Sequence, residues 1–299
     1  MAWVNSLSEP LRRVTAEEYR ALFPQVPTVF DSVDFALLNA AKAEDVAFLA
    51  GRGMGIIVGR RRGDQLWRAP FSAPYASPAG NGDARAFARE LLAFCGGHLK
   101  VTLPPEYRDF SAFANALEEC GLHRINDFSF HLPAERFARY MEVISRQRLR
   151  YTRKVLAMPF TFEQTDDISL FYRVLSEHHH GLGYYIAMTE DEIRATTAVV
   201  PTDFFVARLE GEVAGVAMMD RVSDDVIQMI HWCDALNFRH LRPTTFIAYS
   251  IFRHYATDGR TRLIDLGPAS TDGIPNTGLV DFKLSLGTIQ TLKPTLVTD

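Results

Sequence analysis

The stretch FFVARLEGEVAGVAMM, residues 204–219, decides how the second half of this chain folds. Two apolar runs flank the polar turn Glu210-Gly211-Glu212, which is typical of two antiparallel strands joined by a tight connection. A hairpin of this kind needs further strands beside it, because two strands alone are at best marginally stable. Further strands are expected before and after it in the sequence, at 160–163 and 226–232.

Helices and strands alternate outward from this hairpin. The helix expected at 244–256 has Ile247, Ile251 and Tyr255 on one face, at helical spacing. The remaining segments are assigned by the same periodicity. In the second half, strands are expected at 160–163, 226–232, 263–266 and 288–296, and helices at 134–157, 168–178 and 190–197.

The first half shows a similar order of elements. Strands are expected at 46–49, 54–58, 65–69, 98–103 and 126–132, and helices after Thr15 and at 33–41, 83–94 and 110–119. Helices between strands, with hairpins inside the sheet, indicate a mixed α/β (α+β) fold. We expect two similar domains, residues 1–133 and 134–299, each a mixed, mostly antiparallel sheet flanked by helices.

Composition limits the classes of function. The 299 residues are 47% apolar and 23% charged, as in a globular protein with a full core. The net charge of −4 argues against a general nucleic-acid binder. No apolar run approaches the roughly 18 residues that cross a bilayer, and the N-terminus lacks a secretory signal, so a cytoplasmic protein is expected.

The cysteines and histidines do not predict a metal site. Cys95, Cys120 and Cys233 are far apart and form no CxxC pair, so neither a disulfide framework nor a zinc site is indicated. The run His178-His179-His180 cannot place all three rings on one ion, because consecutive residues of a helix point in different directions.

Several segments resemble the FemAB-like family, whose members carry two tandem GNAT-type acyltransferase domains. They occur in the same order as in that family and together cover about half of the chain. The matching segments are RLRYTRKVLAMPFTFE (148–163), DISLFYRVLSEHHHGLGY (167–184), FFVARLEGEVAGVAMM (204–219), LRPTTFIAYSIFRHYATDGRTRLIDLG (241–267) and DFKLSLG (281–287). The resemblance implies an acyl- or aminoacyl-transferase that forms an amide on a small-molecule or cell-wall-precursor amine. Aminoacyl-tRNA or an acyl carrier would be its donor.

Four residues are candidates for the chemistry, which needs a neutral attacking amine and a group that stabilises an oxyanion. The resemblance places Lys283 near the transferring group. Asp265 ends a strand and could orient an amine or Lys283. His231, expected on the same strand face as Ile227 and Met229, and Asp220, at the end of the preceding strand, could act as a base.

Other residues are candidates for substrate binding. They include aromatic and polar side chains beside the catalytic candidates and in the loop 268–278, and basic side chains on one face of the helix after residue 146, which could bind phosphates. The substrate-binding candidates are Tyr184, Tyr185, His180, Phe282, Asn276, Arg150, Arg153 and Lys154. For each of them, an ordinary structural or solvated role is the alternative.

The sequence departs from acetyl-CoA-dependent acyltransferases at one point. Such enzymes hold the pyrophosphate on a glycine-rich turn before a helix. The corresponding residues here, 237–245, contain no glycine, and Pro243 removes one N–H donor. No cofactor is therefore predicted, and acyl-CoA is disfavoured. An acyl-CoA-dependent or acyl-carrier-dependent N-acyltransferase and a non-catalytic binding protein of the same fold are the alternative functions.

Overall fold

The computed structural model describes residues 9–299, and its contacts divide the chain into two compact units. Unit 1 holds the described residues up to Phe128 together with Ser270–Ile274 and Thr291–Asp299, and unit 2 holds Ser129–Ala269 and Pro275–Gln290. The expected boundary at residue 133 lies close to the division at residue 128. The C-terminal nine residues, however, lie in unit 1. Most of the N-terminal stretch judged to lack a secretory signal lies outside the described residues.

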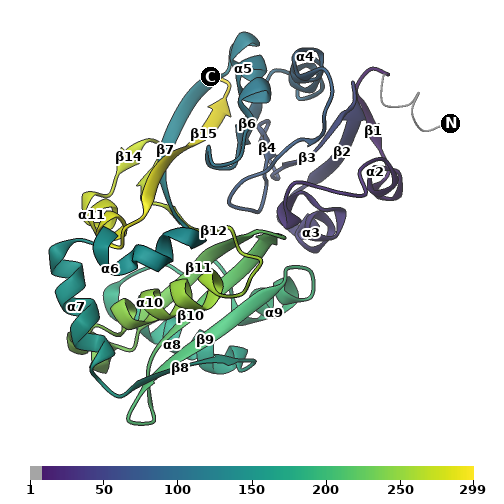
Figure 1. The fold of residues 1–299 in the computed structure, drawn as a ribbon. Helices are drawn as coiled ribbons and strands as arrows, with labels where there is room; N and C mark the ends of the chain where they lie inside the picture. The colour runs from purple at the N-terminus through teal and green to yellow at the C-terminus, as the bar shows by residue number, and fades with distance from the viewer. Residues whose placement is uncertain (1–8) are drawn as a thin grey trace. The chain divides into compact units, whose positions relative to one another are not determined.

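Unit 1 is a mixed sheet covered by helices on both faces (Figure 1). Its strands follow the order β1-β2-β3-β4-β6-β15-β7, with β5 beside β3. Helices α4 and α5 pack on one face, and α2 and α3 on the other. Its elements are β1 (Arg12–Val14), α2 (Ala16–Leu22), α3 (Val33–Leu38), β2 (Asp45–Gly51), β3 (Met54–Arg60), β4 (Trp67–Ala69), β5 (Ala79–Gly80), α4 (Ala84–Phe94), β6 (Leu99–Thr102), α5 (Ser111–Glu119) and the start of β7 (His123–Pro133).

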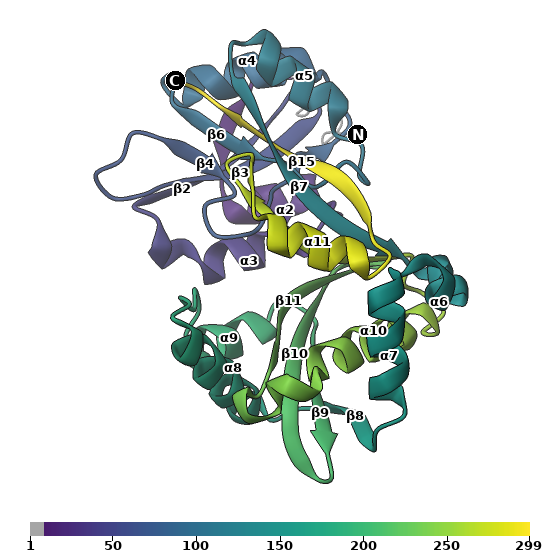
Figure 2. The ribbon, with the colours of Figure 1, turned by 90° about the vertical axis from the view of Figure 1, so that its left-hand side faces the viewer.

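Unit 2 repeats this plan, with strand order β7-β12-β11-β10-β9-β8. Figure 2 shows α8 and α9 on one side of its strands and α10 on the other. Its elements are α6 (Tyr140–Val143), α7 (Arg146–Leu156), β8 (Phe160–Thr165), α8 (Ile168–Leu182), α9 (Glu190–Thr197), β9 (Thr202–Leu209), β10 (Glu212–Ser223), β11 (Val226–Asp234), α10 (Pro243–Ala256), β12 (Leu263–Pro268) and α11 (Thr277–Ser285). Short strands β13 (Ser270–Thr271) and β14 (Ile274–Pro275) pair with each other.

The strand pairings support a duplicated fold. In both units three antiparallel pairings are followed by one parallel pairing, β4 with β6 in unit 1 and β11 with β12 in unit 2. An antiparallel pairing then follows, β6 with β15 and β12 with β7. The expected mixed, mostly antiparallel architecture is confirmed. Among residues 9–299, none of the helices is long and apolar enough to cross a bilayer.

Two elements differ from the sequence prediction. The continuous helix expected at 134–157 is broken, because Ile144 is extended and the Ser145 hydroxyl accepts a hydrogen bond from the Arg148 N–H, which starts α7 afresh. Helix α11 was not predicted. Its apolar residues do not gather on one face, so helical periodicity gives no signal there, although Asn276 caps its first turn.

The C-terminal strand β15 (Ile289–Val297) is completed within unit 1. Thr295, Leu296 and Val297 pair with Thr102, Val101 and Lys100 of β6. The Leu296 side chain is fully buried in the cluster formed with α4 and α5. The end of the chain thus fills a place inside the sheet of unit 1.

We expect Leu296→Ala to lower the free energy of unfolding of unit 1 by about 2–5 kcal/mol, because it leaves a cavity in a packed core. Urea unfolding, with Ile289→Ala as the matched control in the same strand, measures this. Ile289 is 36% exposed, so its truncation should cost much less. Equal effects of the two substitutions would show that β15 does not contribute to the core of unit 1 in this way.

Candidate active site

The parallel strands β11 and β12 separate in the middle of unit 2. Their register covers three residue pairs and ends at Gln228 and Asp265. Beyond these residues β11 continues as a strand to Asp234, whereas β12 bends away and next pairs with β7 at Pro268. The backbone of β11 after Gln228 is therefore not used by β12, and this opening is the candidate active site.

A β-bulge lies on β11 beside the opening. His231 pairs with Met218 and Met229 pairs with Met219, so Ile230 has no partner in the β10 register. Bulges of this kind redirect side chains and are common next to active sites. The bulge also changes which face each residue occupies.

The bulge corrects the predicted orientation of His231. Paired residues share a sheet face, and Met218 packs in the cluster with α8. Met219 instead pairs with Asp203, whose carboxylate accepts a hydrogen bond from the Tyr255 hydroxyl of α10. His231 therefore faces α8, whereas Met229 faces α10. The expectation that they share a face was wrong, because simple alternation does not reveal an inserted residue.

His231 lies in an apolar, histidine-lined environment. Its ring is 6.0 Å from that of His179, which in turn is 6.1 Å from the ring of Tyr184. Burial, with a smaller contribution from His179, lowers the pKa of His231 to about 4. The imidazole is therefore neutral near pH 7 and is a weak base there.

His178 points toward the end of β11, where its Nδ1 lies 2.8 Å from the backbone oxygen and 3.1 Å from a carboxylate oxygen of Asp234. The Asp234 contacts raise the pKa of His178 above its ordinary value, although partial burial opposes them. His180 is exposed on another side of α8 and lies near the Ser176 hydroxyl. Of the three consecutive histidines, the sequence prediction selected His180 and missed the two that face β11.

Lys283 reaches the carboxyl end of β12 from α11. Its ammonium donates hydrogen bonds to the carbonyl oxygens of Leu266, Gly267 and Pro268 at 2.7, 2.9 and 2.8 Å. An ammonium has three N–H donors, and all three are engaged here. Lys283 thus fixes the bend by which β12 leaves β11, instead of offering a donor to a reacting oxygen.

Asp265 and Asp220 stand in one buried row across the sheet, with Gln228 between them in the register. Asp265 accepts the Gly267 N–H at 2.8 Å, which stabilises the same bend. Asp220 accepts the Thr202 hydroxyl at 2.8 Å, and burial raises its pKa to about 7. The structure does not bring either carboxyl group into contact with His231.

Phe282 lines the α10 side of the opening. Its ring lies 5.8 Å from Trp232 of β11, and the Arg148 guanidinium lies 4.8 Å above it. Arg148 also donates to the hydroxyls of Thr245 at 2.8 Å and Ser285 at 3.1 Å. Asn276 caps α11, as described above, and Tyr185 is 86% exposed, so neither approaches Phe282 through a described contact.

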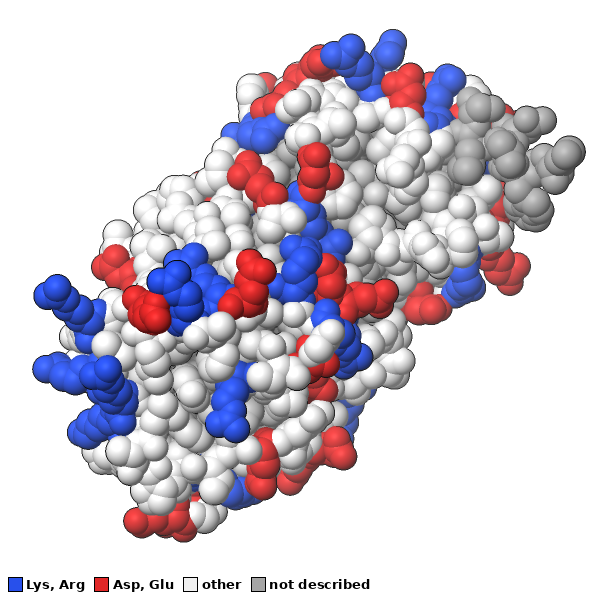
Figure 3. Space-filling view, in the orientation of Figure 1, with Lys and Arg blue, Asp and Glu red and all other residues white. Residues whose placement is uncertain are grey.

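The exposed face of α7 carries a basic row, which consists of Arg146, Arg150, Arg153 and Lys154. Within the described part of the chain, none of the four forms an ion pair. Figure 3 shows Lys and Arg side chains gathered at its left edge, where Figure 1 places α7. The row is available to solution anions.

The start of α10 is not built for a pyrophosphate. Arg242 precedes the helix with φ of 63°, Pro243 occupies its first turn, and residues 234–256 include no glycine. A left-handed arginine and a proline replace the run of free N–H groups that a glycine-rich turn supplies.

In unit 1 the equivalent opening is filled by the chain itself. Strand β4 ends at Ala69, and the loop that follows returns to donate the Ala76 N–H to the Thr102 carbonyl of β6 at 2.9 Å. Tyr75 in this loop is completely buried, and Lys293 donates to the Pro74 carbonyl. This occupation favours unit 2 as the unit that binds substrate.

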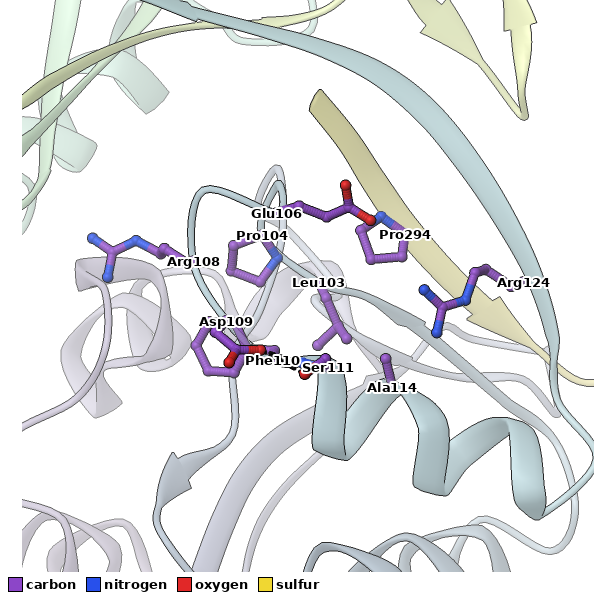
Figure 4. A pocket seen from close by; sticks show the side chains of 10 residues that line it. All are labelled: Leu103, Pro104, Glu106, Arg108, Asp109, Phe110, Ser111, Ala114, Arg124 and Pro294. Carbon is purple, nitrogen blue, oxygen red and sulfur yellow. Dashed lines mark hydrogen bonds between the residues drawn. The ribbon is translucent and has the colours of Figure 1, made fainter. Parts of the chain in front are cut away.

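Unit 1 has a separate cavity of about 260 Å³ between the loop after β6, α5 and β15 (Figure 4). Its two arginines are already engaged. Arg124 forms hydrogen bonds of 2.8 and 2.7 Å with Glu118, and Arg108 donates to the Pro27 carbonyl and points away from the other labelled side chains in Figure 4. It is a weaker candidate than the opening in unit 2.

Comparison with known proteins identifies the fold. No protein-family model matches the sequence. No curated protein matches it either. Among solved structures, FemX superposes with a TM-score of 0.68 at 11% identity, over 97% of both chains.

Two further structures give the same result. The C-terminal domain of a putative lysylphosphatidylglycerol synthetase from Agrobacterium fabrum matches with a TM-score of 0.65 at 12% identity, over 95% of this chain and 93% of that domain. A tandem GNAT protein from the clavulanic acid biosynthesis pathway matches with a TM-score of 0.50 at 13% identity, over 88% and 87%. The chain therefore has a tandem GNAT fold. Its fold is similar to that of FemX, and the tandem GNAT architecture implied by the sequence resemblance is confirmed.

We expect Lys283→Met to destabilise unit 2 by about 1–3 kcal/mol or more, because it leaves buried carbonyl groups without donors. Urea unfolding measures this, with Lys154→Met on the exposed face of α7 as the control. Unchanged stability of Lys283→Met would show that the ammonium does not hold β12.

We expect the contact between His178 and Asp234 to stabilise the fold mainly at low pH. Because the folded-state pKa of His178 is raised, its contribution is present below the ordinary histidine pKa of about 6.5 and is lost as pH rises through the folded value. Asp234→Asn should therefore destabilise more at about pH 5.5 than at about pH 8.5.

Urea unfolding at both pH values measures this difference, and Asp166→Asn removes an exposed carboxylate from the same unit as a control. If Asp234→Asn lowered the free energy of unfolding equally at both pH values, the proposed ion pair between His178 and Asp234 would be contradicted.

Proposed function

We propose that unit 2 transfers an acyl or aminoacyl group to a primary amine and forms an amide. The opening between β11 and β12, with neutral His231 and the bulge at Ile230 on its edge, supports this reaction more than any other feature. The fold shared with FemX and with the lysylphosphatidylglycerol synthetase domain agrees with a transferase. A cytoplasmic small molecule or cell-wall precursor is the proposed acceptor.

The proposed reaction needs only modest proton transfer. The amine nitrogen adds to the donor carbonyl, the bond from the carbonyl carbon to the leaving oxygen breaks, and the proton passes from nitrogen to that oxygen. The amine becomes acidic once it has added, so a weak neutral base such as His231 can take its proton. Backbone N–H groups of β11 beyond Gln228, on the side that β12 no longer pairs with, would stabilise the oxyanion.

Lys283 and Asp265 act as positioning residues in this proposal. Both bind the Leu266–Pro268 bend, Lys283 through three carbonyls and Asp265 through the Gly267 N–H. They keep β12 away from β11, so the donor carbonyl can lie against the free edge of β11.

We propose that the donor is not acyl-CoA. It is an ester carried on a phosphate-rich molecule, such as aminoacyl-tRNA. The basic row of α7 would contact its phosphates, and the start of α10 lacks the glycine turn that acyl-CoA requires. An acyl carrier protein is the second candidate donor, because its single phosphodiester arm needs no pyrophosphate site.

The test is a transfer assay with bulk tRNA charged with radiolabelled amino acids and a cell-wall-precursor pentapeptide as the amine. We expect His231→Gln to lower the transfer rate by about 10²–10⁴-fold, because it removes the base. His98→Gln, an exposed histidine of unit 1, is the matched control.

In the wild-type protein, His231 should not make the transfer rate depend on pH between about pH 6 and 8, because its pKa lies well below this window. A His231→Gln variant as active as the wild type would refute this role. Tight calorimetric binding of CoA would instead favour the acyl-CoA alternative.

A further inference from the structure

A second candidate ligand site lies at the far end of α10. A depression with a volume of about 420 Å³ opens between β8, the end of α7 and the last turns of α10. This volume is within the usual range for small-molecule sites. Its lining residues come from β8, α7, α10 and Thr257 and include none from β11 or β12, so the depression is separate from the opening beside β11.

Aromatic side chains form much of its lining. The Phe160 ring stacks on Phe246 with centroids 4.9 Å apart, and Phe162 meets Phe246 edge to face at 6.4 Å. Tyr249 lines the same depression. Phe160, Phe162 and Tyr249 are only half-buried, although aromatic rings favour full burial. The depression thus offers partly exposed ring surface on which another planar group could stack.

Basic side chains stand at the rim. Arg253 and His254 are exposed and line the depression, and Arg153 of the basic row lies one helical turn before Leu156, which also lines it. In the described part of the chain, the Arg253 guanidinium has no ion-pair partner, and no carboxylate belongs to the lining. The charges favour an anion, and an exposed guanidinium can bind a phosphate or carboxylate through two N–H groups.

We propose that this depression binds a planar aromatic group that carries an anionic substituent, as in a nucleoside monophosphate. The ring stacks against Phe160 and Tyr249, and the anion is bound by Arg253 with support from Arg153. A free aromatic carboxylate shares this chemistry, so the test separates the two sources.

The test uses the full chain and measures binding without turnover, so its outcome does not depend on the proposed transferase activity. Isotope-labelled protein is titrated with 5′-AMP, adenosine, inorganic phosphate and indole-3-acetate, each to about 10 mM, while amide shifts are followed. We expect saturable shifts with 5′-AMP that are confined to β8, the end of α7 and the last turns of α10.

Two variants separate the contributions. Arg253→Gln should weaken 5′-AMP binding about 5- to 10-fold, toward the affinity of adenosine. Phe160→Leu keeps an apolar side chain but removes the ring, and should weaken both 5′-AMP and adenosine. Arg173→Gln, an exposed arginine on α8, should change neither, and the amide spectrum of each variant confirms its fold.

Tighter binding of indole-3-acetate than of 5′-AMP, with the same dependence on the variants, would support the site and assign it to aromatic acids. The aromatic part of the proposal would be overturned if inorganic phosphate bound as tightly as 5′-AMP. It would also be overturned if Phe160→Leu had no effect on the binding of 5′-AMP and adenosine. No saturable shift with any of the four probes would overturn the site itself.

Discussion

The hydrogen bonds from the Lys283 ammonium to the carbonyls of Leu266, Gly267 and Pro268 are the contact on which the site in unit 2 depends. Here the pairing of β11 with β12 ends after three residues, at the bend held by Lys283 and Asp265, and β12 does not pair with the second half of β11. A buried ammonium is costly unless its donors are satisfied, and three carbonyls at hydrogen-bonding distance meet that requirement.

The two units differ most at this point, although their strands pair in the same sequence. In unit 1 the loop that contains the buried Tyr75 lies beside β6. The Ala76 N–H of this loop donates a hydrogen bond to the Thr102 carbonyl of β6. In unit 2 no such loop follows β11, which runs on to Asp234 and then into the segment before α10. Of the two similar units, unit 2 is thus the one in which no loop fills this place. The histidines of α8 and β11 belong to the same unit.

Much of the fold could be predicted from the sequence because its signals are local. The turn at Glu210-Gly211-Glu212 predicts the hairpin of β9 and β10. The periodic apolar face of residues 244–256 predicts helix α10. Helix α11 was missed because it has no apolar face, and the pairing of β15 within unit 1 was missed because it joins residues almost 200 positions apart.

The site could be predicted less well. Lys283 and Asp265 were found, but the backbone carbonyl and N–H groups that they bind at the bend cannot be recognised from residue types. The orientation of His231 depends on the bulge at Ile230, and strand alternation gives the wrong face without it. His178 was passed over in favour of His180, since the choice among consecutive histidines depends on the rotation of α8 against β11.

The central claim is that the donor carbonyl lies in the opening between β11 and β12. Photo-cross-linking tests it most directly, with tRNA that carries a photoreactive aminoacyl group and mass spectrometry of the labelled peptides. The account predicts labels on residues 229–232 of β11 or 266–268 of β12. Labels confined to unit 1, above all to residues 70–77, would contradict it.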